Sequence, residues 1–562
     1  MQVSSPGLAS ALFVALIAFS PLTGAQSVEY GCNADQLLMQ EEPATSDHMG
    51  QSIAVGGDFN GDGFRDIVMG GYKRNPAAGM TRVFVFLGTG SSPSGSPLSE
   101  PIFRHVLTIN GLADHDLFGF AVAFVGDLNG DDCDELAVGA PRYDAPGLTD
   151  SGRVWIFFGR PDLESDDEYA DVDGTAAEHL SFDGRVDGEW YGTSLATPQD
   201  GSGNYLKDLL VGAPGNGPVD DEDAVVGAVY QIETPTLEDA SDLAATISGV
   251  AIGASPLSGT PGIAGTVELG FVATAHRVLH GDDPGDRFGH ALAFVGSVDG
   301  LPGQEFLVGA PQFAEESGTR TTSGPGYVRL FNLGNPTPLI TIWGEQEPTG
   351  TPREGGEAFG FAVAGGLQLN PGTDSVPDFV IGAPLFDATF AGPSLKPDAG
   401  RVVAFSGDAA GDGVAIPMFG DPAEENGTVM FGFDSTHEFG FSVAGVPDMD
   451  ADGIDEVLVG AWEATVVGAC TSTAMLRQGG AAYLFFPGSA DPGDPPYKFF
   501  PEAFRDHMGR AVAAGHLVDT DPPMSPPQAE IVLSGVAWST STVSEAGKGY
   551  VWLGELLPTS SP

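Results

Sequence analysis

Hydrophobic and polar positions along the chain follow one pattern that occurs seven times. Each repeat opens with a bulky apolar residue and a glycine, and a short strand with alternating apolar residues follows, as in Phe441-Ser-Val-Ala-Gly445. An acidic loop comes next, and then an apolar strand that ends in Gly-Ala-Pro or a close variant. A third strand rich in β-branched and aromatic residues and a weaker fourth strand complete the repeat. The opening pairs are Met49-Gly50, Phe118-Gly119, Tyr191-Gly192, Phe288-Gly289, Phe359-Gly360, Phe439-Gly440 and Met508-Gly509.

Seven repeats of four antiparallel strands predict an all-β fold, a seven-bladed β-propeller that hides most sheet edges by radial repetition. The last repeat lacks a fourth strand, and residues 36–40 lie before the first repeat where a fourth strand should be. We therefore expect this N-terminal strand to close the ring by pairing with the C-terminal strand. The predicted propeller covers 26–558, with an insertion in blade three at 233–274. Its blades begin near residues 48, 117, 190, 287, 358, 438 and 507.

The composition agrees with many short strands and limits the choice of partners. The chain has 81 glycines and 43 prolines, which favour turns over helices. It has 77 acidic and 22 basic residues, so its net charge of −55 repels a phosphate backbone and excludes nucleic acid as a partner. Two explanations of the acidity remain open, namely solubility in a salty setting and the binding of cations by clustered carboxylates.

Residues 1–25 are predicted to be a secretory signal peptide. The apolar run from Leu8 to Phe19 is too short to cross a bilayer, and small residues precede a cleavage point before Gln26. The alternative is a buried strand. No later segment predicts a transmembrane span, so we expect a secreted, extracellular or cell-surface protein, or a periplasmic one in a Gram-negative bacterium. Three cysteines without regular spacing do not indicate a disulfide framework.

The acidic loops carry oxygen ligands at positions one, three, five and nine, with a backbone carbonyl at position seven. This donor set suits calcium, and the glycines between the ligands permit a sharp turn. Three loops fit well, and they comprise Asp58, Asn60, Asp62, Phe64 and Asp66; Asp127, Asn129, Asp131, Cys133 and Glu135; and Asp448, Asp450, Asp452, Ile454 and Glu456. A weaker fourth set is Asp200, Ser202, Asn204 and Asp208.

The remaining three loops are degraded, including a fifth loop counted from Asn370 to Asp378 and a seventh from Asp519 to Glu530. The predicted Ca²⁺ is structural: it would neutralise crowded carboxylates and couple ion binding to folding. The competing explanation is that these loops are solvated acidic turns without an ion.

The opposite face carries aromatic residues just after the Gly-Ala-Pro corners in six of the seven repeats. They are Tyr72, Tyr143, Phe313, Phe386, Trp462 and Trp538. Clustered surface aromatics favour docking of a protein or a glycan. The alternative is that each ring packs sideways between blades. Histidines in the loops before Phe-Gly indicate a solvated rim rather than a transition-metal site, because no loop shows ligand spacing.

The order of Phe-Gly, acidic loop and Gly-Ala-Pro resembles the FG-GAP repeats of the integrin α-subunit head, over roughly residues 33–556. The resemblance implies a seven-bladed propeller with calcium loops on a lower face and partner docking on an upper face. The chain departs from an integrin subunit in lacking leg domains and a membrane anchor, which leaves heterodimer formation open.

The function that we predict is adhesion, or protein or glycan binding, through the upper face of a calcium-binding propeller. We predict no enzymatic activity, because the sequence has no nucleophile elbow, zinc-protease helix or phosphate-binding glycine loop. The alternative is a calcium-dependent extracellular enzyme such as a polysaccharide lyase, or a phospholipase that carries such repeats. A structural spacer in an envelope assembly is the third possibility.

Overall fold

The structure is a computed structural model of the whole chain. It describes residues 36–38, 49–71, 81–90, 102–113, 115–128, 130–161, 163, 179–198, 208–215, 226–233, 277–283, 285–298, 304–316, 319–322, 324–333, 335–345, 356–369, 376–387, 396–405, 407, 429–432, 436–449, 452–467, 475–476, 479–487, 497–500, 506–517, 529–535 and 547–552. The predicted signal peptide and the predicted insertion after Glu233 lie outside these residues.

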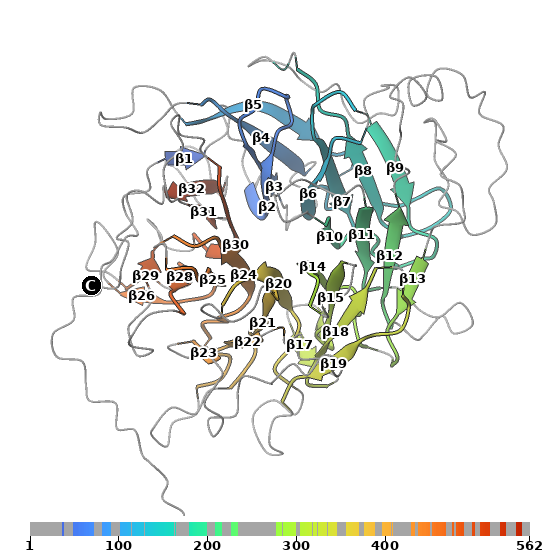
Figure 1. Cartoon of the computed structure of the whole chain (residues 1–562). Coiled ribbons are helices and arrows are strands. Elements are labelled where there is room, and N and C mark those ends of the chain that lie inside the picture. The colour runs from blue at the N-terminus through green and yellow to red at the C-terminus, as the bar shows by residue number, and fades with distance from the viewer. Residues whose placement is uncertain are drawn as a thin grey trace, which may run out of the picture.

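Seven four-stranded antiparallel sheets form the blades of a ring, as predicted. In Figure 1 the first strand of each blade lies nearest the centre. In chain order from the centre outwards, the blades are β2(Met49–Gly57), β3(Asp66–Gly71), β4(Arg82–Gly88), β5(Phe103–Asn110); β6(Ala121–Gly126), β7(Glu135–Ala140), β8(Arg153–Phe157), β9(His179–Asp183); β10(Ser194–Ala196), β11(Asp208–Ala213), β12(Ala228–Glu233), β13(Arg277–His280); β14(Ala291–Gly296), β15(Glu305–Ala310), β18(Tyr327–Asn332), β19(Ile340–Trp343); β20(Ala362–Leu367), β21(Asp378–Ala383), β22(Arg401–Phe405), β23(Val429–Phe431); β24(Ser442–Val446), β25(Glu456–Ala461), β28(Ala481–Phe485), β29(Tyr497–Phe499); and β30(Met508–Gly515), β31(Glu530–Gly535), β32(Lys548–Trp552), β1(Gln36–Leu38).

The seventh blade joins the two ends of the propeller. β1 pairs antiparallel with β32, with Leu37 opposite Tyr550. Figure 1 shows β1 beside β32. The predicted closure of the ring by an N-terminal strand is therefore confirmed.

The repeated glycines are needed where neighbouring blades touch. A Cβ atom on Gly70, near the end of the second strand of blade one, would lie 1.9 Å from the carbonyl oxygen of Gly119, the glycine of the next Phe-Gly pair. The same contact recurs between Gly139 and Gly192 at 2.1 Å. No side chain fits at these distances, so the two motifs of each repeat are the two halves of one blade-to-blade contact.

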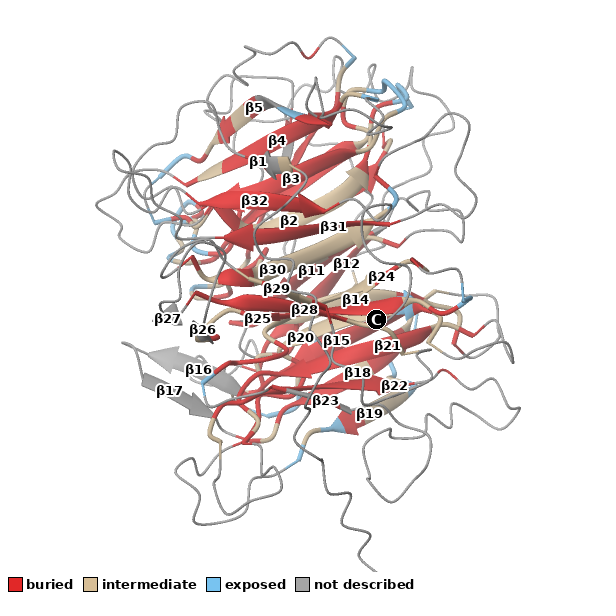
Figure 2. Cartoon of the chain, turned by 90° about the vertical axis from the view of Figure 1, so that its left-hand side faces the viewer, coloured by how far each residue is buried: buried red, intermediate tan, exposed pale blue. Residues whose placement is uncertain are grey.

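The hydrophobic core lies between adjacent blades. The ring of Phe118, which opens blade two, packs edge-on against Trp155 and Phe157 with centroids 5.3 and 6.1 Å apart. In Figure 2 buried residues run along the strands, and exposed residues gather in the loops at the two ends of the blades. Each blade therefore depends on its neighbours for its core.

The ends of the strands define two faces of the ring. We call the face with the connections between first and second strands the lower face, and the face with the Gly-Ala-Pro corners and the connections between blades the upper face. Two hairpins, β16(Phe313–Glu316) with β17(Thr319–Thr322) and β26(Val466–Val467) with β27(Met475–Leu476), extend corner connections of blades four and six. None of the described residues forms a helix long and apolar enough to cross a membrane.

Candidate functional site

The first acidic loop, between β2 and β3, folds around the carboxylate of Asp58. Its two oxygens accept hydrogen bonds from the backbone N–H groups of Asp62 at 3.0 Å and Gly63 at 2.8 Å. Gly63 has a φ of +87°, which glycine adopts without strain. In the sixth loop Asp448 accepts the two corresponding bonds at 3.2 and 2.9 Å. The shared residue pattern therefore produces one shared loop conformation.

The second loop, between β6 and β7, brings three carboxylates together. Asp127, Asp131 and Glu135 each offer an oxygen, and these oxygens lie within 4.8 Å of one another. Asp127 also accepts the N–H of Asp132 at 3.0 Å, which repeats the turn of the first loop. Three hard oxygen donors at this separation could supply part of the six to eight oxygens that a calcium ion takes.

Two buried oxygens in these loops lack a hydrogen-bond partner among the described residues: Glu135 Oε1 and Asn60 Oδ1. Burial raises the pKa of the Glu135 carboxyl to about 9, and the negative charges of Asp127 and Asp131 add to this. An unpaired buried acceptor costs about 1–3 kcal/mol. A bound cation would compensate both oxygens, so the residues present fit calcium.

In six of the seven loops the structure describes the last acid, and this acid has a role that needs no ion. Its carboxylate accepts the backbone N–H of the second loop residue, which clamps the loop shut. The bonds run from Phe59 to Asp66 (2.7 Å), Leu128 to Glu135, Val298 to Glu305 (2.8 Å), Leu369 to Asp378 (2.6 Å), Met449 to Glu456 (2.9 Å) and Leu517 to Glu530 (2.7 Å). Three of these loops lack the calcium pattern, so the clamp is a general feature of the blades.

The second oxygen of the clamping acid distinguishes the loops. In blades one and five it accepts an N–H at the end of the third strand or just beyond it, from Gly88 to Asp66 at 2.9 Å and from Gly407 to Asp378 at 3.0 Å. The second oxygen of Glu135 has no such donor in the described part of the chain. Of these three loops, the second thus leaves its last carboxylate most open to an ion.

The clamp corrects the register of two degraded loops. Because Leu369 and Leu517 occupy the second position, the fifth loop begins at Gln368 rather than Asn370, and the seventh begins at His516 rather than Asp519. Insertions within these loops caused the miscount. Neither loop has an acid at its first position, which strengthens the case that they are degraded.

Several predicted ligands lie outside the described residues, namely Asn129, Asp450, Asp200, Ser202 and Asn204. Asp208 begins β11, but its side chain is not described. Cys133 and Ile454, which would offer backbone carbonyls, are buried, whereas Phe64 is half-buried. The third loop therefore stays a sequence prediction.

On the upper face, two of the predicted aromatics pack against an arginine that begins a third strand. The Arg153 guanidinium lies 3.9 Å from the ring centroid of Tyr143, and Arg401 lies 4.4 Å from that of Phe386. Tyr143 also meets Trp155 edge-on at 5.5 Å. These two rings are half-buried, as in the sideways-packing alternative. Tyr72, Trp538 and the side chain of Phe313 lie outside the described residues.

Trp462 has a different environment. Its ring centroid lies 5.0 Å from that of Phe441 and 5.0 Å from that of His507, and its indole N–H donates to Glu438 at 2.7 Å. The Arg510 guanidinium lies 4.8 Å from the same indole. Trp462 is therefore part of a larger half-buried aromatic group.

This group continues through residues that directly follow the Phe-Gly pairs, which sequence reasoning missed. Phe361 contacts Phe441 at 4.8 Å and His290 at 4.5 Å between ring centroids. Arg510 donates to Gln51 at 2.6 Å and so links blade seven to blade one. All of these residues are half-buried. We call His290, Phe361, Phe441, Trp462, His507 and Arg510 the aromatic arc.

The residue directly before each Phe-Gly pair has a left-handed backbone. The six described cases are Leu117, Trp190, Arg287, Ala358, Glu438 and His507, with φ between 50° and 58°. This conformation costs a residue with a side chain roughly 1–2 kcal/mol. The cost recurs around the ring although the side chains differ completely. The sequence signal for this left-handed residue is its fixed position directly before the Phe-Gly pair.

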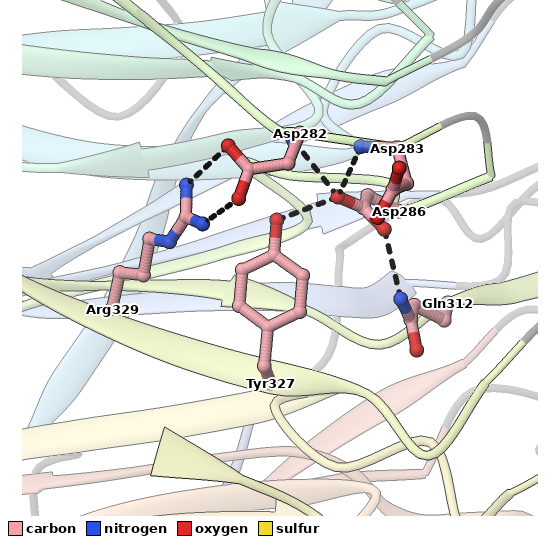
Figure 3. Close-up of polar contacts among 6 residues, drawn as sticks. All are labelled: Asp282, Asp283, Asp286, Gln312, Tyr327 and Arg329. Carbon is pink, nitrogen blue, oxygen red and sulfur yellow. Dashed lines mark hydrogen bonds and ion pairs between the residues drawn. The ribbon is translucent and has the colours of Figure 1, made fainter. Parts of the chain in front are cut away.

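In five of the six described connections between blades, a buried acid lies two residues before the Phe-Gly pair or its equivalent; before blade six this residue is His437. In Figure 3 Asp286 accepts the N–H groups of Asp282 and Asp283, each at 3.0 Å, the Tyr327 hydroxyl at 2.7 Å and the Gln312 amide at 2.8 Å. Burial raises the pKa of Tyr327, so it stays a hydrogen-bond donor. The equivalent Glu357 is paired with Arg401. These acids are structural, because their hydrogen bonds lie within the blades.

The fold and its acidic loops thus define a β-propeller built from FG-GAP repeats. A family model described as the FG-GAP repeat matches residues 49–80 and 118–157. The chain is 29% identical to integrin alpha-PS2 of Drosophila melanogaster over 54% of its length, and 32% identical to integrin alpha-IIb of Mus musculus over 36%. It is also 32% identical to a phosphatidylinositol-glycan-specific phospholipase D of Dictyostelium discoideum over 30% of its length.

These matches cover 18% of each integrin and 17% of the phospholipase. Two segments of the chain therefore match the FG-GAP repeat, and the chain is similar to integrin α subunits over part of its length. The likeness extends to one relative whose name is that of an enzyme.

Proposed function

We propose that the chain is a secreted or cell-surface, calcium-binding propeller that binds an extracellular protein or glycan through its upper face. The aromatic arc carries this proposal. It places half-buried rings and the Arg510 guanidinium in continuous contact across four blades. Aromatic and arginine side chains held in fixed positions are the residues that dominate binding energy in protein interfaces.

Calcium has a supporting role in this proposal. Ions would be held by Asp58, Asn60, Asp62 and Asp66 in the first loop, by Asp127, Asp131 and Glu135 in the second and by the Asp448 loop of blade six. Calcium would neutralise these carboxylates and make ion binding part of folding. Extracellular loops of this kind bind calcium with dissociation constants of about 10⁻⁴–10⁻³ M, so secretion and calcium binding support each other.

The similarity to integrins supports a binding role more than an enzymatic one. Two of the three relatives named above are integrins. The buried acids Asp286 and Glu357 of the upper face are engaged in structural hydrogen bonds and an ion pair, which leaves these two unsuited to proton transfer.

The test is a binding screen of the purified chain against a glycan array and a panel of extracellular-matrix proteins, in calcium and in chelator. For any ligand found, we expect Trp462→Ala to weaken binding at least about tenfold, because interface tryptophans often contribute 2 kcal/mol or more. Trp343→Ala is the matched control, since Trp343 is 51% exposed on the outer strand of blade four. Equal losses in the two variants, or an unchanged Trp462→Ala, would contradict docking through the arc.

A further inference from the structure

The first and second acidic loops are joined by backbone hydrogen bonds across the blade boundary. The N–H of Asp134 donates to the carbonyl oxygen of Asp58 at 2.7 Å. In return, the N–H of Asp58 donates to the Asp134 carboxylate at 2.8 Å. A third bond runs from the N–H of Arg160 to the carbonyl oxygen of Phe59 at 3.0 Å. The two loops therefore form one hydrogen-bonded unit.

Close packing prevents the loops from moving independently. A Cβ atom on Gly61 would lie 2.9 Å from the carbonyl oxygen of Asp132 and 2.9 Å from the sulfur of Cys133. A Cβ atom on Gly159, which follows β8, would lie 2.4 Å from the carbonyl oxygen of Phe59. Any displacement of one loop must displace the other.

Asp134 occupies a special position in this unit. It is bonded to Asp58, the first ligand position of the first loop, and it lies between Cys133 and Glu135, the last two ligand positions of the second. We infer that the first and second loops bind Ca²⁺ as a cooperative pair, with Asp134 as the positioning residue that couples them. This inference rests on the calcium binding proposed above.

We expect the coupling between the two ions to be favourable for two reasons, one from conformational entropy and one from the repulsion among the carboxylates. An ion in one loop fixes the backbone of Asp58 or of residues 133–135, so less conformational entropy remains to be lost when the second ion binds. Each ion also reduces the repulsion among carboxylates that the two loops bring together. We therefore expect the first ion to increase the affinity for the second.

Blade six contains an internal control for this inference. Asp455, the counterpart of Asp134, makes the same pair of bonds, accepting the N–H of Gln368 at 2.8 Å and donating to its carbonyl oxygen at 2.7 Å. Here, however, the neighbouring fifth loop starts with glutamine and lacks the calcium pattern. The sixth loop should therefore bind calcium without cooperativity, although it makes the same pair of bonds to the preceding blade.

The experiment is a calcium titration of the chelator-treated full chain by isothermal calorimetry, in a background of Asp448→Ala and Asp200→Ala that leaves only the first two loops. We expect two ions with a Hill coefficient above one. Asp134→Ala should keep two ions, remove the cooperativity and weaken the pair about three- to tenfold. Asp134→Asn retains a hydrogen-bond acceptor and should keep most of the coupling.

Two further variants separate coupling from a general loss of structure. Asp455→Ala should leave the cooperativity of the first two loops unchanged. Asp62→Ala and Asp131→Ala, each of which disables one loop, should weaken the other loop by the same factor, because coupling is reciprocal. Two independent sites, or equal effects of Asp134→Ala and Asp455→Ala, would overturn the inference but leave calcium binding intact. If no calcium is bound, the proposed function fails as well.

Discussion

The two faces of the propeller are built on the same sevenfold repeat, but they differ in what is repeated. On the lower face the described loops share both backbone and side chain: an acid at the last position accepts the second N–H in blades with and without the calcium pattern. At the position directly before the Phe-Gly pair, on the upper face, only the backbone recurs. The strained position before Phe-Gly is Trp190 in one blade, Arg287 in the next and Ala358 in the one after.

This difference separates the parts that build the ring from the parts that are free to select a ligand. A side chain that recurs with its hydrogen bond contributes to the fold of every blade, so it carries little information about function. The left-handed backbone conformation costs free energy and recurs with unrelated side chains. It therefore holds a different side chain in the same position in each blade. The lower face is therefore where stability should be tested, and the upper face is where specificity should be tested.

The largest expected effect is the loss of stability when a clamping acid is removed from a lower-face loop that lacks the calcium pattern. It measures the contribution of the clamp without that of an ion. Glu305 is fully buried in a loop without the calcium pattern and accepts the N–H of Val298. Glu305→Ala leaves buried donors unpaired and should lower the free energy of unfolding by about 3 kcal/mol, measured by urea denaturation. The loss should be the same in calcium and in chelator.

Glu135→Ala is the matched variant in a calcium loop. It should cost about 2–3 kcal/mol more in excess calcium than in chelator, since it removes the stabilisation that a bound ion provides at about 100 times its dissociation constant. A loss at Glu135 that does not depend on calcium would show that the second loop is only a clamp.

A smaller effect concerns the buried acids of the upper face. Asp116 is 5% exposed, and its Oδ2 atom has no hydrogen-bond partner among the residues described. Burial raises its pKa to about 6; nearby Asp144 adds to the rise, whereas Arg153 and His115 oppose it. Folding therefore favours the protonated form, and the stability that Asp116 contributes declines as the pH rises from about 4 to 6.

Asp116→Asn should accordingly melt at about the same temperature as the parent at pH 4, and about 1–2 °C above it at pH 8. Calorimetry at a series of pH values measures the difference. Asp286→Asn disturbs an acid with four donors and should destabilise the protein at every pH. If the melting temperatures of the parent and of Asp116→Asn change with pH in parallel, burial does not disfavour the charged form of Asp116.

The smallest expected effect measures the strain of the upper-face backbone. Ala358 has a φ of 57° and a fully buried side chain. Ala358→Gly should raise the free energy of unfolding by about 0.5–1 kcal/mol, because glycine adopts this conformation without strain. Ala310→Gly in β15 is the control and should lower it by a similar amount. Destabilisation by both changes would show that the left-handed conformation carries no strain.

The sevenfold ring could be predicted from the sequence, because the Phe-Gly and Gly-Ala-Pro motifs recur together in the same order in each repeat. The seven pairs of motifs predicted seven blades. The segment at 36–40, which precedes the first repeat, predicted a seventh sheet made from both ends of the propeller. The shared loop turn around Asp58 and Asp448 was also readable, since it depends on residues close in sequence.

Other features depend on contacts between residues far apart in the chain. Nothing near Asp134 in sequence indicates its bonds to Asp58, and the contact between Phe361 and His290 joins two different blades. The register of the fifth loop failed because counting acids from Asp378 ignored the insertion that the clamp reveals. Inter-blade contacts are set by the geometry of the ring rather than by local pattern.

The pairing of β1 with β32 means that the ring cannot close until its last strand has been synthesised. Leu37 is synthesised long before its partner Tyr550. At about 5–20 residues per second, the early strand waits on the order of a minute for its place in the sheet. Throughout that time the nascent chain exposes unpaired strand edges, so the seventh blade is where chaperone protection and misassembly should concentrate.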